Sequence, residues 1–471
     1  MKLKSLIQNN NHLEIAEVEI EFIPGIPQIH FLGLPDRIIK ESFYRIKSAL
    51  KSSGYKFPLT SQMIVNIKPS HLRKSSRGVE LAVALGILLK TEQIDESLVD
   101  KNWILYGELG LDGQVYQPSD LAYEVMNYKN EIFLSGINED QRKIDHQNVY
   151  KLKSLINFEV HRPTKENYQI NFQRPTFGFY QKYSKDEAEF IYLTVTSGLH
   201  GLLAGDSGAG KSTLAKAVLS FSKEPDQEEP VRYIDMWRPL VNPHQSITPA
   251  AFLGGGAYLH EGEIERAQGG VLLLDELLEF NHEILEALRG PMTGETLRLS
   301  RGASHREIKT NFQVIATTNL CPCGKWTPVK ANVGCRFSRT KCTRYLERLS
   351  GPILDRFCIL YFVSAAPQRK VEAIELHKRI LRTQKYLAEL EFEIPDELIN
   401  QYYEKLSARR KKYLDHIAKL YALERHLQNK QKGGLPAKVS VKSAIKLQFQ
   451  DYSQAERWVI KPFEQLEKGM S

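Results

Sequence analysis

The sequence lacks any apolar run that could cross a lipid bilayer, and it has few cysteines. Its longest apolar stretch, Leu81–Leu89, is much shorter than the roughly 20 residues of a membrane-spanning helix, so we predict no membrane partner. The N-terminal segment Met1–Asn10 turns polar too early for a signal peptide, and we therefore expect a cytoplasmic location. Five cysteines among 471 residues are too few for a disulfide scaffold.

No charge of one sign dominates the chain, which carries 64 Lys and Arg against 56 Asp and Glu. The hydrophobic fraction of 42% and the charged fraction of 25% are ordinary for a globular protein, which excludes a disordered, collagen-like or coiled-coil chain. At about 100–200 residues per domain, the length predicts two to four domains. A net charge of +8 is too small to identify a partner, so the positions of the basic residues are more informative.

The order of the expected elements predicts an α/β multidomain protein. Residues 1–162 alternate strand-like and helix-like segments and form one α/β domain, and the polar residues 163–184 form a linker. A second α/β domain is expected over 185–365, and a charged helical region over 366–471. The main elements expected in the first domain are a strand over 15–22, a helix over 35–52, a strand over 63–67 and a helix over 79–89.

The segment Gly205-Asp-Ser-Gly-Ala-Gly210-Lys211-Ser212 matches the phosphate-loop pattern in full. An apolar strand-like run precedes it and a helix-forming run follows, so its glycines can bring backbone N–H groups to phosphates at a helix N-terminus. Lys211 would reach the β- and γ-phosphates, and the Ser212 hydroxyl would bind Mg²⁺. The alternative is a glycine-rich turn without a ligand. The predicted nucleotide-binding residues are Gly205, Asp206, Ser207, Gly208, Ala209, Gly210, Lys211, Ser212, Thr213 and Asp275.

Two further strand-like runs end in polar residues. The first ends in Asp275 and Glu276, where the first acid suits Mg²⁺ and the second suits a general base that orients the attacking water. The second ends in Asn319, whose amide can hold that water, although it can also be a turn former. Arg356 follows a short apolar turn, and taken by itself it suits a surface ion pair.

These four segments, in this order, resemble an AAA+ ATPase of the magnesium-chelatase-like branch, and more narrowly the YifB/ComM family. The resemblance implies a ribosomal-S5/Lon-like N-terminal domain, an AAA+ phosphate-loop core and a C-terminal helical lid. It also implies a hexameric ATP-driven motor that promotes DNA branch migration during homologous recombination in natural transformation, with recombination proteins as further partners. The narrower motifs are Gly254–Gly256, Gly262–Ile264, Leu274–Phe280, Asn319–Gly324, Gly33–Leu50 and Tyr106–Gly113.

The family resemblance also assigns roles to arginines. Because ATP would lie between subunits, Arg356 becomes an arginine finger that reaches the γ-phosphate of a neighbour. Arg409 becomes the sensor-2 arginine of the lid, although Arg410 fits that role equally.

A Lon-like fold raises the question of peptidase activity. The matching region, Arg73–Glu80, contains Ser75 and Ser76, but Arg77 and Glu80 replace the small residues that surround the Lon nucleophile. We therefore expect no proteolysis, and we interpret this loop as a lost site or as a surface that contacts DNA or another subunit.

Four cysteines, in the arrangement C-x-C followed by C-x₆-C, can complete a tetrahedral zinc site. The alternatives are thiols in a basic loop and another metal. In the family a second C-x-C pair is typical, and Phe337 stands where its last cysteine is expected, so Cys342 would substitute. Some relatives lack the cysteines, so the zinc would be structural. The predicted ligands are Cys321, Cys323, Cys335 and Cys342.

Basic residues gather between Leu297 and Arg344, where ten lysines and arginines stand against one acid, Glu307. The part around Gly302 alternates as a β-hairpin does. In chelatase-like AAA+ proteins such a hairpin points into the ring pore, so we expect it to contact the DNA backbone. The alternative is a solvated basic loop. The predicted DNA contacts are Arg301, Arg306 and Lys309.

Two function classes compete with a DNA motor. One is a chelatase-like or chaperone-like ATPase that remodels protein partners, and the other is a binding scaffold without turnover. The scaffold is disfavoured because Lys211, Asp275, Glu276 and Asn319 are all present.

Overall fold

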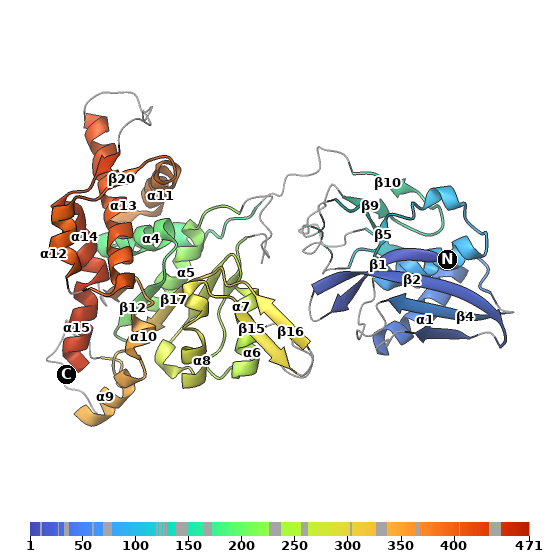
Figure 1. Cartoon of the computed structure of the whole chain (residues 1–471), viewed down its shortest axis with the longest axis horizontal. Coiled ribbons are helices and arrows are strands. Elements are labelled where there is room, and N and C mark those ends of the chain that lie inside the picture. Colours follow the sequence, from blue (N-terminus) through green and yellow to red (C-terminus); the bar gives the residue numbers. More distant parts are fainter. Residues whose placement is uncertain are drawn as a thin grey trace. The chain divides into compact units, whose positions relative to one another are not determined.

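The computed structural model divides into two compact units, Met1–Phe172 and a second unit that begins at Gln173. The boundary falls inside the linker predicted over 163–184, and Figure 1 shows the two units separately in blue to green and in green to red. The three-domain division, with 185–365 and 366–471 apart, stays a prediction. The residues that the structure describes are 1–9, 12–26, 28–32, 37–58, 61–68, 78–118, 121, 125, 128, 130–137, 148–163, 172–225, 237–255, 262–301, 304–325, 337–363, 368, 370–404, 406–432 and 444–470.

The first unit is built on one mixed eight-stranded sheet in the order β10-β9-β8-β5-β1-β2-β4-β3. Strands β1, β2 and β4 are antiparallel neighbours, whereas β5, β8 and β9 continue the sheet from β1 in parallel. A small separate hairpin, β6–β7, follows β5. The strands are β1 Lys2–Asn9, β2 His12–Pro24, β3 Ile29–Leu32, β4 Ser61–Lys68, β5 Ile104–Leu105, β6 Glu108–Leu109, β7 Val115–Tyr116, β8 Phe133–Ser135, β9 Val149–Leu152 and β10 Val160–His161.

Two helices pack on this sheet, α1 (Arg37–Ser52) and α2 (Val79–Lys90), with a short 3₁₀ turn at Glu96–Leu98 after them. Every residue of α2 from Val79 to Leu89 is buried, as its apolar sequence predicts. The helices and strands expected from the sequence in this unit are therefore confirmed, with ends that differ by a few residues.

Glu80 is buried at the start of α2. It is the last residue of Arg73–Glu80, the segment that the sequence analysis compared with the region around the Lon nucleophile. Its carboxylate accepts hydrogen bonds from the Ser42 hydroxyl (2.6 Å) and the Leu109 N–H (2.8 Å). Burial raises the pKa of this carboxyl. Glu80 thus ties α2 to α1 and β6. Ser75, Ser76 and Arg77 lie outside the described residues, so the absence of proteolysis stays a prediction.

The second unit contains a five-stranded sheet in the order β13-β14-β17-β12-β18, and all of its neighbouring strands are parallel. In such a sheet the carboxyl ends of the strands meet at one edge, which is where α/β proteins place their ligands. The strands are β12 Gly201–Gly205, β13 Leu240–Val241, β14 Val271–Leu274, β17 Gln313–Thr318 and β18 Ile359–Val363.

Helices cover this sheet, and a two-stranded hairpin, β15–β16, stands apart from it (Figure 1). The hairpin consists of β15 Leu297–Arg301 and β16 Ser304–Ile308, and Arg301 pairs with Ser304 at its tip. The other elements of this part are η4 Phe177–Tyr180, β11 Lys182–Tyr183, α4 Lys185–Ser197, α5 Lys211–Phe221, α6 Pro249–Leu253, α7 Glu263–Arg266, η5 Leu277–Glu279, α8 His282–Ala287, η6 Pro291–Thr293, α9 Arg339–Glu347 and α10 Gly351–Leu354.

The C-terminal helices belong to the same unit. Arg379 of α11 connects them to the core helix α4, because its guanidinium pairs with Glu189 (2.6 Å) and with Glu424 of α13. The guanidinium also lies 3.7 Å from the centre of the Tyr192 ring. These elements are β19 Val371–Glu372, α11 Ala373–Leu387, β20 Phe392–Glu393, α12 Asp396–Tyr403, α13 Ala408–Lys432, β21 Ile445–Lys446, α14 Phe449–Val459 and α15 Lys461–Met470.

Helix α13 carries basic residues at its start and buries an apolar face, which consists of Leu414, Ile417, Tyr421 and Leu427. Among the helices that the structure describes, none is both long enough and apolar enough to cross a membrane.

Candidate functional site

The phosphate loop connects the buried strand β12 to helix α5, which begins at Lys211. Gly208 and Gly210 have φ angles of +78° and +89°, a region that residues with a side chain rarely adopt. The loop therefore needs glycine at these positions in order to turn its backbone N–H groups toward the start of α5. This geometry suits a phosphate.

Lys211 is buried, and three oxygen atoms hold its ammonium group. Its Nζ donates to the carbonyls of Gly205 (3.0 Å) and Asp206 (2.7 Å) and to the Asn319 side-chain oxygen (2.9 Å). Burial lowers the pKa of this ammonium group. Asn319 and Lys211 are 108 residues apart in sequence, so the parallel sheet has brought the end of β17 to the phosphate loop, as predicted.

Asp275 joins the end of β14 to both neighbouring segments. Its Oδ1 accepts hydrogen bonds from the Ser212 hydroxyl (2.7 Å) and from the Thr317 hydroxyl (2.6 Å). A carboxylate beside a hydroxyl is a set of hard oxygen ligands, which suits Mg²⁺. Sequence reasoning missed Thr317, which is one of two threonines at the end of β17.

Glu276 follows in an unusual backbone conformation, with φ 58° and ψ 58°. Such a left-handed conformation in a non-glycine residue is strained and is often found at functional sites. Its N–H donates to the Thr317 hydroxyl (2.9 Å), and its Oε2 accepts from the Gln245 side-chain amide (2.7 Å). Gln245 was not identified from the sequence, because nothing in its local pattern marks a site residue.

A cavity of about 310 Å³ lies over these groups. It brings together the phosphate loop, the two acids after β14 and the end of β17, which the sequence had placed in one site. Gly205, Asp206, Ala209, Arg356 and Arg409 do not line it. The residues that line the cavity are Ser207, Gly208, Gly210, Lys211, Ser212, Thr213, Asp275, Glu276, Thr317 and Asn319.

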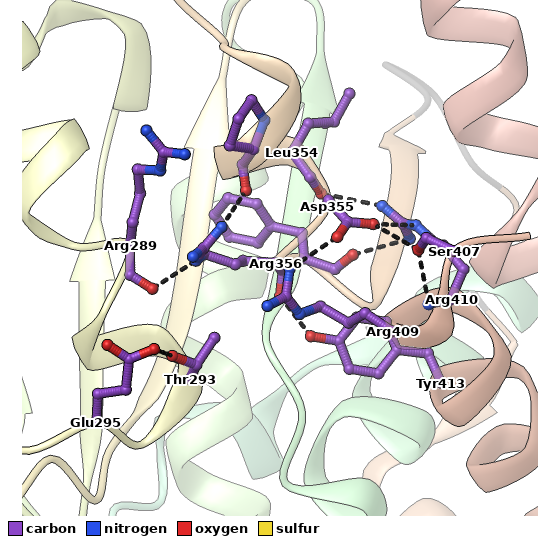
Figure 2. Close-up of polar contacts among 12 residues, drawn as sticks. Arg289, Thr293, Glu295, Leu354, Asp355, Arg356, Ser407, Arg409, Arg410 and Tyr413 are labelled. Atoms are coloured by element: carbon purple, nitrogen blue, oxygen red, sulfur yellow. Dashed lines mark hydrogen bonds and ion pairs between the residues drawn. The ribbon is translucent and has the colours of Figure 1, made fainter.

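Arg356 lies outside this cavity in a group of arginines at the start of the C-terminal helices (Figure 2). The Arg356 guanidinium donates to the carbonyls of Arg289 and Pro352. The carbonyl of Arg356 accepts a hydrogen bond from the Tyr413 hydroxyl (3.1 Å). Partial burial, followed by the neighbouring Arg409 and Arg289, lowers the pKa of the Arg356 guanidinium. Two of the neighbouring arginines have acidic partners, since Arg409 pairs with Asp355 (2.7 Å) and Arg289 pairs with Glu286.

The two arginines predicted for the sensor-2 role have different surroundings. Arg409 donates to Asp355 (2.7 Å), the residue before Arg356. Arg410 is almost completely buried: it donates to the carbonyls of Leu354 and Phe357, and it lies 3.6 Å from the centre of the Phe463 ring. Arg410 thus has a structural environment. Arg409, which stands beside Arg356 in Figure 2, is the better candidate for a ligand contact.

Three of the predicted zinc ligands contact one another. The Cys321 Sγ lies 3.1 Å from the Cys323 Sγ and 3.3 Å from the Cys342 Sγ. In a tetrahedral zinc site these distances are about 3.8 Å, since Zn–S bonds are near 2.3 Å. Within the described part of the chain, no group of three or more potential ligands is arranged to hold a metal ion. Cys335 lies outside that part.

The basic hairpin forms as predicted, but its charge is partly neutralised. Arg298 of β15 pairs with Glu307 of β16 (3.0 Å). Lys309, just after β16, is exposed. Arg301 and Arg306 occupy the strands, and their side chains lie outside the described part of the structure. The DNA contacts therefore stay predictions.

Comparison with known proteins finds two matching families over separate parts of the chain. Residues 183–371 match the family described as magnesium chelatase, subunit ChlI, and residues 18–135 match the family described as subunit ChlI of Mg-chelatase. The first match contains the cavity described above. A match to this family implies ATP and Mg²⁺ as cofactors.

Similar whole proteins match most of the chain. The chain is 30% identical to the competence protein ComM of Haemophilus influenzae over 391 residues, which is 76% of this chain and 75% of that protein. It is 29% identical to the uncharacterized protein YifB of Escherichia coli, covering 72% and 71% of the two chains. It is 27% identical to the uncharacterized protein Rv2897c of Mycobacterium tuberculosis, covering 73% of each. The chain therefore belongs to the YifB/ComM family of magnesium-chelatase-like proteins.

Proposed function

We propose that this protein is an ATP hydrolase whose turnover drives remodelling of DNA. The observation that supports hydrolysis most strongly is the Asp275 carboxylate, hydrogen-bonded to Ser212 and Thr317 in the cavity that also holds Lys211, Glu276 and Asn319. A phosphate-binding loop, a magnesium ligand and a general base are thereby within one cavity. A scaffold that only bound nucleotide would not need the base.

Each group has a role in the proposed reaction. The loop N–H groups and Lys211 bind the β- and γ-phosphates, and Ser212 and Asp275 hold Mg²⁺. Glu276 accepts a proton from the attacking water, and Asn319 orients that water against the γ-phosphate. The ammonium of Lys211 already contacts the Asn319 amide (2.9 Å), so both groups would face the same phosphate.

Arg356 completes the site of a neighbouring subunit in this proposal. It does not line the cavity of its own chain, so in this proposal it would reach a γ-phosphate only across a subunit interface. Arg409, joined to the same loop through Asp355, would accompany it. A closed ring of identical subunits repeats this contact at every interface, and the family resemblance implies a hexamer.

DNA is the proposed substrate of the motor, in single-stranded or branched form. The hairpin β15–β16 stands apart from the core sheet and carries Arg301 and Arg306 on its two strands and Lys309 at its base. Cations on such a hairpin can follow the phosphate backbone. A relative with 30% identity is named a competence protein, which supports a role in natural transformation, and the family resemblance implies branch migration as the reaction.

DNA binding by the hairpin can be tested through its salt dependence. Replacing Arg301 and Arg306 by Gln should flatten the slope of log affinity against log salt by about 1.4 to 1.8, because each lost phosphate contact removes about 0.7 to 0.9. Fluorescence anisotropy with single-stranded and branched DNA measures the slope, and the same DNA should stimulate wild-type ATPase activity. Lys378→Gln, a neutralisation at an exposed position on α11, is the matched control.

Two results would count against this part of the proposal. An unchanged slope in the double variant would move the DNA contact away from the hairpin. ATPase activity that is indifferent to DNA would favour the second candidate, an ATPase that remodels protein partners. That candidate is supported by the match of both units to magnesium chelatase subunits.

A structural zinc ion is a further part of the proposal. The C-x-C spacing and the contacts among Cys321, Cys323 and Cys342 support it, whereas the short distances between sulfur atoms do not. Elemental analysis of protein purified without chelator should find about one zinc per chain, because four thiolates complete a closed tetrahedral site. Finding no metal would leave the cysteines as packed thiols.

A further inference from the structure

The turn that follows Asn319 contacts the phosphate loop directly. The N–H of Ser207, in the first half of the loop, donates to the carbonyl of Gly324 (2.8 Å). The N–H of Gly324 in turn donates to the carbonyl of Cys321 (2.8 Å) and closes a turn over Cys321–Gly324. Asn319, two residues before the turn, accepts from Lys211 in the second half of the loop. One segment therefore supports the phosphate loop at two points.

The contact between the two loops is close, and the backbone at its centre favours glycine. Gly324 has a φ of +68°, and a Cβ added there would lie 3.1 Å from the Cβ of Ser207. Any side chain at 324 would press on the phosphate loop and strain its own backbone. The position of the Ser207 peptide thus depends on the conformation of the turn.

Cysteine contacts connect this turn to helix α9. Cys321 is buried at its start, and its sulfur contacts the sulfur of Cys323 within the turn and that of Cys342 outside it. Cys342 lies in the first turn of α9, whose N-terminus is capped by the Ser338 side chain. The turn is therefore attached to a helix, rather than being held by its own backbone alone.

We propose that the cluster Cys321, Cys323 and Cys342 is a positioning element of the nucleotide site. It fixes the Cys321–Gly324 turn, and through the Gly324 carbonyl it fixes the Ser207 N–H and the shape of the phosphate loop. Nucleotide affinity consequently depends on an intact cysteine cluster. This holds both if the thiols pack against one another and if they bind a metal ion. This inference rests on the proposed binding of ATP at Lys211.

The experiment measures binding of a fluorescent ATP analogue with Mg²⁺ to the full-length protein. Cys342→Ala should weaken binding about tenfold, because the phosphate loop would then lose its support and part of the binding free energy would be used to order it. Gly324→Ala should weaken it to a similar extent without removing any thiol. The matched control is Cys358→Ala, which removes the buried cysteine before β18 and should change the affinity less than twofold.

Steady-state kinetics and metal content separate positioning from folding. A positioning role predicts that KM rises about tenfold while kcat at saturating ATP changes little. Wild-type affinity in both Cys342→Ala and Gly324→Ala would overturn the inference. If Cys342→Ala does not fold, as judged by circular dichroism, Gly324→Ala and Cys323→Ala decide the question. The metal content of each variant shows whether the thiols act with an ion or without one.

Failure of this inference can be distinguished from failure of the proposed function. If wild-type protein binds the analogue and Lys211→Ala does not, the nucleotide site stands whatever the cysteine variants show. If wild-type protein fails to bind the analogue, the proposed function itself is wrong.

Discussion

Replacing Glu276 by Gln should lower ATP turnover at least about a hundredfold while ATP binding is retained. A general base contributes roughly 10²–10⁴ to a rate, and the amide cannot accept the proton of the attacking water. Binding should survive because the phosphate contacts come from the loop and Lys211. The new amide is similar in size, and its oxygen can still accept the hydrogen bond that Gln245 donates to Glu276 (2.7 Å).

The change is measured as phosphate release under single-turnover conditions, together with equilibrium binding of an ATP analogue. The matched control is Glu279→Gln, which removes an exposed carboxylate three residues further along, outside the cavity, where it accepts from the Tyr345 hydroxyl (2.9 Å). The control should keep turnover within a few-fold of wild type. Turnover near the wild-type rate in Glu276→Gln would show that another group activates the water.

Replacing Arg356 by Ala should lower turnover about 10³-fold or more without abolishing nucleotide binding. An arginine that stabilises the charge of the transferred phosphoryl group in trans is worth about 10³–10⁵ in rate. Nucleotide binding should be retained because Arg356 does not line the cavity of its own chain. Lys378→Ala, at an exposed position on α11, is the control for loss of a cation.

Mixing two inactive variants tests whether Arg356 acts between subunits. Lys211→Ala lacks a working nucleotide site but keeps the arginine, whereas Arg356→Ala keeps the site but lacks the arginine. In mixed rings about a quarter of the interfaces would combine an intact site with an intact arginine, so part of the activity should return. If the mixture stays as inactive as its components, Arg356 acts within its own chain or serves the structure of the α10 turn.

Much of the fold could be predicted because the apolar pattern follows the secondary structure closely. Helix α2 reads as a continuous buried run, and β14 and β17 are aliphatic runs that end in polar residues. The arrangement at the carboxyl edge of the sheet could also be predicted, since parallel strands bring Asp275 and Asn319 together with the phosphate loop. For the four elements whose bounds were predicted in the first unit, only the ends shifted, by a few residues.

The site residues that the sequence did not identify contact partners that are distant in the sequence and close only in the folded chain. Thr317 was missed although it connects Asp275 and Glu276, because a threonine in a β-strand is ordinary. Gln245 reaches Glu276 from a loop 31 residues away, and its role depends on where that loop folds. Local patterns contain no information on such pairings.

The sequence by itself predicted the phosphate loop, because this loop is a local motif in which glycine spacing, lysine and serine must follow one another. Only the tertiary structure showed that Gly324 supports Ser207 and that Arg409 joins Arg356 through Asp355 while Arg410 is buried. These pairings link segments that are far apart in the chain. They depend on side-chain packing, on helix ends and on the distance between two loops, and none of these is encoded in the spacing of residues along one segment.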